Sequence, residues 1–114
     1  MCLKFSPDRK TWLQAKAECE SDGARLVKID TEDKMRDVSY ILVADHIGKF
    51  FIGARNHNGS WEWTDGSVVK QQWWLFRDEP SDYSHRDCLV ARSDFADWHN
   101  IPCRRLRRYI CEKL

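Results

Sequence analysis

The sequence predicts a single domain of the α+β class. Two helix-like patterns occupy the first part of the chain, and short strand-like runs occupy the rest. The 114 residues are enough for one domain and too few for two. With 42% hydrophobic residues and six tryptophans, the chain can build a real core, which excludes a disordered tail.

The first predicted helix begins after Thr11. Thr11 and Gln14 have the spacing of a capping box, in which the two residues exchange side-chain and backbone hydrogen bonds. Apolar residues then recur at i, i+3 and i+7, namely Trp12, Ala15 and Cys19. Gly23 supplies a stop signal.

A second helix is expected from about Thr31, and strands are expected after it. Met35, Val38 and Leu42 lie on one face of this helix. Beyond His46 the pattern changes to short apolar runs between polar loops that hold glycine and proline, which is typical of strands. The runs are residues 50–53, 61–63, 88–90 and 109–111.

The charge balance and hydropathy exclude several partners. The 19 basic and 18 acidic residues leave a net charge of +1, so no overall field attracts nucleic acid or an anionic membrane. No apolar run approaches the roughly 20 residues of a membrane helix. Met1 is followed by neither a basic nor an apolar leader segment, so we expect a domain excised from a longer protein.

Five cysteines indicate an oxidising compartment. They are Cys2, Cys19, Cys88, Cys103 and Cys111. This number in a short chain is typical of disulfide-bonded proteins, so a secreted or extracellular location is expected. None forms a Cys-x-x-Cys pair, which argues against zinc-knuckle and redox sites. The odd number predicts that one cysteine has its partner in preceding sequence or in another chain.

A set of short motifs occurs in a fixed order along the chain. They are Cys2-Leu3-Lys4-Phe5, Cys19, Leu26-Val27-Lys28-Ile29, Phe51-Ile52-Gly53-Ala54, Gly59-Ser60-Trp61-Glu62-Trp63, Asp65-Gly66, Trp74, Glu79-Pro80, Asp87-Cys88, Trp98, Pro102-Cys103 and Tyr109-Ile110-Cys111-Glu112. In this order they resemble the C-type lectin-like domain over essentially the whole chain, so residues 1–114 are expected to form one such domain. The resemblance implies two helices, short antiparallel sheets and a long loop region.

The same resemblance implies two disulfides, Cys19–Cys111 and Cys88–Cys103, although the sequence alone allows other pairings. Loop entropy gives them roughly 4–5 and 3 kcal/mol of stabilisation, respectively. The long form of the family has an additional N-terminal hairpin closed by a further cysteine pair. Cys2 matches the second member of that pair, so we expect this hairpin to be cut off before Cys2. An intermolecular disulfide is the alternative.

The resemblance also locates five positions that bind calcium in sugar-binding members of the family. They are Glu79, Ser81, Arg86, His99 and Asn100. The usual set, Glu-Pro-Asn, a downstream Glu and Trp-Asn-Asp, has a total charge of −3 and also bonds sugar hydroxyls. Here Glu79 and Arg86 cancel and the other three are neutral. Because calcium prefers several charged oxygen ligands, we expect no required cofactor and weak or absent calcium binding, with a Glu79–Arg86 ion pair instead.

An auxiliary calcium site of the family is expected to be weak or empty as well. Asp82 and Asp87 fall on its acidic positions, but Asn56 and Asn58 stand where Asp and Glu are common. The weak metal candidates overall are Glu79, Asp82, Asp87 and Asn100.

The histidines near these positions suggest two further chemistries, neither well supported. Zinc would need three or four ligands, and the region offers only His85 and His99. Ser81 or Ser84 beside His85 would be the best nucleophile and base, but nothing resembles a nucleophile elbow. We therefore predict that the chain is not an enzyme.

Aromatic and basic residues complete the candidate surfaces. Trp61, Trp63 and Trp98 are predicted to fill the core. The candidates for an exposed contact surface are Trp73, Trp74 and Phe76. Residues 104–108, Arg-Arg-Leu-Arg-Arg, could bind sulfated glycans or anionic polymers. Alternatively they form a solvated surface, since alternation in the last strand would divide them between two faces.

Two functions remain. The first is an extracellular carbohydrate-recognition domain, possessing weak, altered or absent calcium dependence, in an innate-immune or cell-surface protein. The alternative is a protein-binding module whose loop, with residues 73–76, forms a partner or dimer interface; oligomers are compatible with both. The expected ligand-binding residues are Trp74, Glu79, Ser81, Arg86, Asp87, His99 and Asn100.

Overall fold

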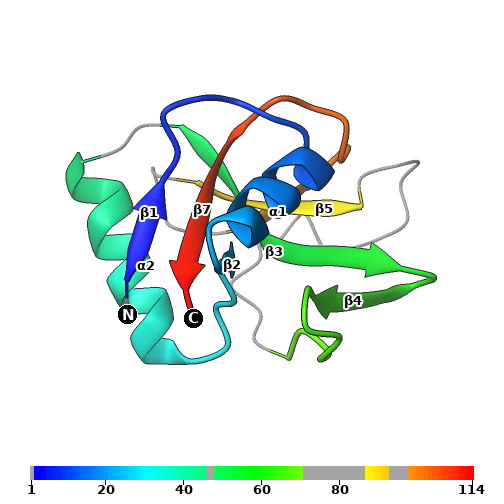
Figure 1. Cartoon of the computed structure of the whole chain (residues 1–114). Coiled ribbons are helices and arrows are strands. Elements are labelled where there is room, and N and C mark those ends of the chain that lie inside the picture. Colours follow the sequence, from blue (N-terminus) through cyan, green and yellow to red (C-terminus); the bar gives the residue numbers. More distant parts are fainter. Residues whose placement is uncertain (1, 46–47, 71–86, 93–97) are drawn as a thin grey trace.

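The computed structural model describes residues 2–45, 48–70, 87–92 and 98–114. Within these residues, helices and strands alternate early and strands dominate later (Figure 1). In order they are β1 Leu3–Phe5, α1 Trp12–Ser21, β2 Ala24–Leu26, α2 Glu32–Asp45, β3 Lys49–His57, β4 Ser60–Trp63, β5 Cys88–Arg92, β6 Trp98–Ile101 and β7 Arg108–Lys113. Neither described helix is long and apolar enough to cross a membrane. The predicted α+β class is confirmed.

The predicted capping box begins α1. The Thr11 hydroxyl accepts a hydrogen bond from the Gln14 amide at 3.3 Å, and the Thr11 amide donates to Gln14 Oε1 at 3.1 Å. Two of the amides that a helix N-terminus leaves unpaired are thereby satisfied. Trp12, Ala15 and Cys19 face the core as predicted. The chain leaves the helix through Gly23, whose φ of 71° lies in the left-handed region that favours glycine.

The second helix, α2, also begins as expected. The Thr31 hydroxyl accepts a hydrogen bond from the Lys34 amide at 3.1 Å, and Met35, Val38 and Leu42 are buried on one face. In Figure 1 this helix lies beside β1 at one edge of the molecule.

The sheet has the strand order β1-β7-β3-β5-β6, with β2 also paired to β7 and β4 to β3. All pairs are antiparallel except β3 with β7, which run parallel. Parallel neighbours need a long crossover, and the chain from β4 to β6 lies between these two strands. The strands expected from the apolar runs are confirmed, whereas β1, β2 and β6 were not predicted.

Two clusters of buried residues fill the space between helices and sheet. The core prediction for Trp61, Trp63 and Trp98 is confirmed, since all three are at most 9% exposed. Trp63 and Trp98 meet edge to face, with ring centroids 5.7 Å apart. Gly53 allows β3 to pass close to the chain just after β2, where its amide donates to the Val27 carbonyl at 2.9 Å.

Both predicted disulfides are present. Cys19–Cys111 joins α1 to β7, and Cys88–Cys103 joins the start of β5 to the turn after β6. Cys2 is exposed and is not disulfide-bonded within the chain.

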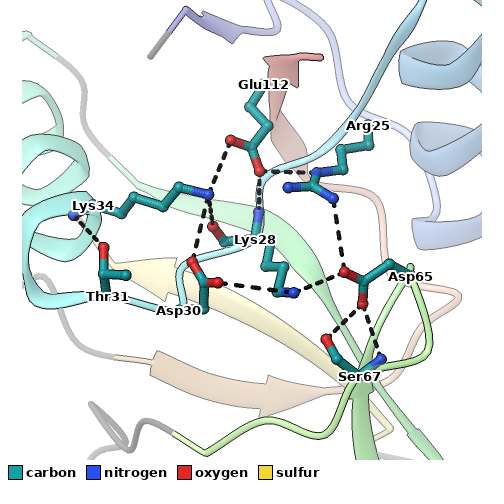
Figure 2. A network of polar contacts seen from close by, with 8 residues as sticks. All are labelled: Arg25, Lys28, Asp30, Thr31, Lys34, Asp65, Ser67 and Glu112. Carbon is teal, nitrogen blue, oxygen red and sulfur yellow. Dashed lines mark hydrogen bonds and ion pairs between the residues drawn. The ribbon is translucent and has the colours of Figure 1, made fainter.

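A network of charged side chains joins β2, α2 and β7 (Figure 2). At its centre is the buried Glu112, whose Oε1 accepts hydrogen bonds from Arg25 Nε at 3.0 Å and from the Lys28 amide at 2.9 Å. Lys34 Nζ lies 3.4 Å from the other carboxylate oxygen. Because the buried carboxylate has several partners, its charge is compensated, and α2 is held against the end of β7.

Asp65 extends this network to the turn after β4. Its carboxylate accepts hydrogen bonds from Lys28 Nζ at 2.7 Å and from the Ser67 hydroxyl and amide at 2.6 and 2.9 Å (Figure 2). The Lys28 ammonium, followed by the two Ser67 bonds, holds the pKa of the Asp65 carboxyl well below its usual range.

Candidate functional site

The described residues fix both ends of the 71–86 segment. Before it, residues 61–69 fold back on themselves: the Trp63 amide donates to the Ser67 carbonyl at 2.8 Å, and the Val69 amide donates to the Trp61 carbonyl at 2.9 Å. The salt bridge between Lys28 and Asp65 ties this turn to the chain between β2 and α2. The residues just before position 71 are therefore held in place by the turn and by the Lys28–Asp65 salt bridge.

After the segment, Asp87 is anchored to β3. The Asn56 amide donates to the Asp87 carbonyl at 2.7 Å, and Asn56 Nδ2 donates to Asp87 Oδ1 at 3.3 Å. The next residue, Cys88, is held by its disulfide to Cys103. Asp87 is thus a half-buried carboxylate on a rigid part of the sheet.

His99 and Asn100 lie on β6, beside β5. Asn100 is opposite Leu89 and His99 is opposite Val90 in the antiparallel register. Consecutive side chains of a strand point to opposite sides, and burial follows this alternation: Asn100 is only 4% exposed, whereas His99 is half-buried. Asn100 is consequently the more rigidly held of the two, and His99 the more accessible.

The structure places three of the seven predicted ligand-binding residues, Asp87, His99 and Asn100, at the neighbouring strands β3, β5 and β6. The remaining four, Trp74, Glu79, Ser81 and Arg86, lie outside the described residues, as do Trp73, Phe76, Asp82, Ser84 and His85. The Glu79–Arg86 ion pair and the loop contact surface therefore stay predictions.

The described residues by themselves do not form a metal site. Across residues 2–45, 48–70, 87–92 and 98–114, no group of three or more His, Cys, Asp or Glu side chains could hold a metal. At the principal calcium position implied by the resemblance, the described residues are His99 and Asn100, an imidazole and an amide. An imidazole nitrogen is not the hard oxygen ligand that calcium prefers. At the auxiliary position, Asp87 is accompanied by Asn56, whose buried Oδ1 has no hydrogen-bond partner among the described residues. Calcium takes six to eight oxygen ligands, so these two residues would need further donors from outside the described part of the chain.

Sequence reasoning missed the residues that anchor the segment. Lys28 and Asp65 appeared only as members of motifs, and the Asn56–Asp87 hydrogen bond was not predicted. These contacts join parts of the chain far apart in sequence, so no local pattern signals them.

Comparison with known proteins gives a consistent result. The model of the family described as "Lectin C-type domain" matches residues 8–113. The hepatic lectin of Gallus gallus is 29% identical to the chain, over 98% of the chain and 54% of its own length. The chain spans 54% of the length of that relative and 38% of the length of the asialoglycoprotein receptor 2 of Mus musculus.

Two solved structures show how closely the fold agrees. The mouse scavenger receptor C-type lectin carbohydrate-recognition domain has a TM-score of 0.88 at 25% identity, covering 98% of this chain and 87% of its own. A calcium-independent type II antifreeze protein has a TM-score of 0.83 at 26% identity, covering 96% of this chain and 83% of its own.

Proposed function

The chain belongs to the C-type lectin domain family, and on this premise we propose that it is an extracellular carbohydrate-recognition domain with weak, altered or absent calcium dependence. The family consists of non-enzymatic lectins, in agreement with the prediction that the chain is not an enzyme. The match over nearly the whole chain carries the proposal, supported by relatives described as a hepatic lectin and as a carbohydrate-recognition domain.

The ligand is proposed to bind beside strands β5 and β6, at Asp87, His99 and Asn100. Asp87, His99 and Asn100 are held there by a disulfide and by backbone pairing. A preorganised set of polar groups costs little ordering entropy on binding. Trp74, Glu79, Ser81 and Arg86 would complete the site from the segment.

Altered calcium dependence rests on the chemistry of the donors. Glu79 and Arg86 cancel in charge, and His99 and Asn100 add none. A site without net negative charge attracts a divalent cation too weakly to offset the free-energy cost of removing its water. The fold is compatible with this state, since a similar structure is described as calcium-independent.

Location follows from the disulfides. Two bridges in a chain of this size are typical of an oxidising compartment, so the domain is proposed to act outside the cell.

The proposal is tested by calcium titration calorimetry together with a glycan array read with and without chelator. We expect little or no calcium heat and a glycan signal that chelator leaves unchanged. Chelator-sensitive sugar binding would contradict the altered calcium dependence. No glycan signal in either condition would favour the protein-binding alternative.

Restoring the family's donor set gives a matched comparison. The variant Ser81→Asn/Arg86→Glu/His99→Asn/Asn100→Asp has the usual charge of −3 and is expected to gain calcium binding. Since Asn100 is buried, Arg86→Glu/His99→Asn serves as a milder version that leaves this position intact. Equal calcium affinity in the unchanged chain and both variants would contradict the charge argument.

A further inference from the structure

Two basic segments, far apart in the sequence, lie side by side at the start of β7. The Lys10 amide donates to the Arg107 carbonyl at 2.9 Å, and the Arg107 amide donates back to the Lys10 carbonyl at 3.0 Å. Figure 1 shows the segment leading into α1, in blue, and the one leading into β7, in orange, along the same edge of the molecule. Basic residues from both segments are therefore brought together.

We call this region the basic surface. Its members are Arg9, Lys10, Arg104, Arg105, Arg107 and Arg108. Arg9, Arg104 and Arg105 are exposed, and the other three are half-buried. Six cationic residues thus lie on two short stretches of chain that are joined by the Lys10–Arg107 backbone hydrogen bonds.

Few acidic groups neutralise these cations. Lys10 pairs with Asp8 at 3.3 Å, whereas the structure gives the five arginines of the basic surface no ion pair with a described carboxylate. Among the described residues, Arg107 Nη1 donates to the carbonyl of the adjacent Leu106, and Arg108 Nε is buried and has no hydrogen-bond partner. The exposed guanidinium groups, those of Arg9, Arg104 and Arg105, are the ones available to an external anion.

The expectation that strand alternation divides these arginines does not hold for Arg104 and Arg105. Arg104 and Arg105 lie in a turn, where the Arg105 amide donates to the Pro102 carbonyl at 3.1 Å, and only Arg108 belongs to β7. The alternation rule applies to extended strands, and a turn does not follow it.

The turn that carries Arg104 and Arg105 is also held in place. Cys103, immediately before it, is bonded to Cys88, and its carbonyl accepts a hydrogen bond from the Trp12 amide at 3.0 Å. A rigid backbone lowers the entropy lost when arginines on it bind a ligand.

We propose that the basic surface binds a sulfated polysaccharide. A guanidinium presents paired N–H donors that match the oxygens of a sulfate group. A linear polymer with repeated sulfates can contact several arginines at once, so individually weak contacts add up along the chain. Because the 114 residues have a net charge of only +1, a polyanion is attracted by a local group of cations and not by the overall charge. These residues are distinct from those of the proposed glycan site between Glu79 and Asn100.

Other polyanions fit the surface less well. Single-stranded nucleic acid is usually held by aromatic stacking as well as by charge, and the basic surface contains no aromatic residue. Anionic lipids are concentrated in the cytoplasmic leaflet, whereas the two disulfides indicate an oxidising compartment. A sulfated polymer matches both the charge and the compartment.

The test measures binding of the chain to immobilised heparin, a sulfated polysaccharide, at about physiological salt. Arg104→Ala/Arg105→Ala is expected to weaken binding roughly tenfold. This loss corresponds to two surface contacts that each contribute somewhat under about 1 kcal/mol. Arg9→Ala should weaken it about threefold, because the first segment contributes to the same surface. Elution from heparin should move to lower salt in both variants.

The matched control is Lys16→Ala/Arg36→Ala, which removes the same charge from the two helices and should bind like the unchanged chain. Circular dichroism verifies that each variant folds. The proposal would be overturned if the control variant lost as much heparin binding, or if the unchanged chain did not bind heparin. It would also be overturned if the chain bound DNA or anionic vesicles more tightly than heparin. Chelator should not affect heparin binding, and a negative glycan array would leave this result standing, so the two proposals fail separately.

Discussion

Gly53 lies where β3 passes directly beneath the backbone of residues 26–27. A Cβ atom at this position would be 2.7 Å from the Leu26 carbonyl oxygen and 3.0 Å from that of Val27. Backbone atoms cannot move aside as the end of a side chain can. This close approach therefore requires glycine at position 53, and it brings β2 onto the central strand.

Replacing Gly53 by alanine should lower the free energy of unfolding by about 2 kcal/mol, because strands β2 and β3 must separate to admit the methyl group. Urea denaturation of the purified domain measures this change. Gly23→Ala is the comparison. A Cβ atom added at Gly23 would meet no described atom within 4 Å, so this variant carries the strain of a positive φ without a steric clash. A Gly53→Ala variant as stable as the unchanged chain would contradict the steric explanation.

Asp65 is expected to make stability depend on pH in the acid range. Because its pKa is depressed in the folded state by Lys28 and Ser67, its contribution is complete above the unfolded pKa of about 3.9 and is lost as the pH falls through the lower folded pKa. Asp65→Asn should therefore show a smaller loss of unfolding free energy between neutral and strongly acid pH.

NMR titration of the Asp65 carboxyl gives the second measurement. In Lys28→Met, which keeps the aliphatic stem but not the ammonium, the pKa of Asp65 should rise toward its ordinary value. Identical titration curves in both proteins would show that Lys28 is not the cause.

At the scale of the elements, α1 depends on its capping box. Thr11→Ala removes the hydroxyl that accepts from the Gln14 amide, and it should cost about 1 kcal/mol of stability. Chemical denaturation measures the loss. Thr11→Ser keeps the acceptor and should remain close to the unchanged chain, so a similar loss in both variants would indicate a different role for Thr11.

The longer elements could be predicted because their signals are local. Helices α1 and α2 were predicted from apolar residues at helical spacing after a threonine. Strands β3, β4, β5 and β7 were predicted from apolar runs between turn residues. In contrast, β1 and β2 are three residues long and form only because both pair with β7. A segment this short is too brief for a periodic pattern, so its partner decides its conformation.

For the whole molecule, Cys88–Cys103 is the bridge nearest the candidate site. Cys88→Ala/Cys103→Ala should lower the free energy of unfolding by about 3 kcal/mol, since the bridge closes a loop with a sequence separation of 15. It should also loosen the turn with Arg104 and Arg105, and so weaken heparin binding.

Denaturation of the oxidised variant measures the first effect, and heparin elution measures the second. The comparison is Cys19→Ala/Cys111→Ala, which should cost more stability because its sequence separation is 92. A larger loss from the shorter loop would contradict the entropic argument.

The sequence motifs indicated where the residues of the candidate site lie along the chain, but they did not indicate how exposed each side chain is. The motifs located Asp87, His99 and Asn100, and the structure brings them to adjoining strands. Their burial did not follow from the motifs, because the exposure of His99 and of Asn100 depends on which face of β6 meets the core.

By itself, the sequence determined the fold class, the two helices and four of the strands, and the resemblance of its ordered motifs to a known family implied the disulfide pairing. These properties depend on neighbouring residues or on the order of motifs that can be read along the chain. Only the tertiary structure decided the parallel pairing of β3 with β7, the burial of Glu112 among Arg25, Lys28 and Lys34, and the meeting of Lys10 with Arg107. Each joins residues distant in sequence, and packing of the whole chain, rather than any local preference, brings such residues into contact.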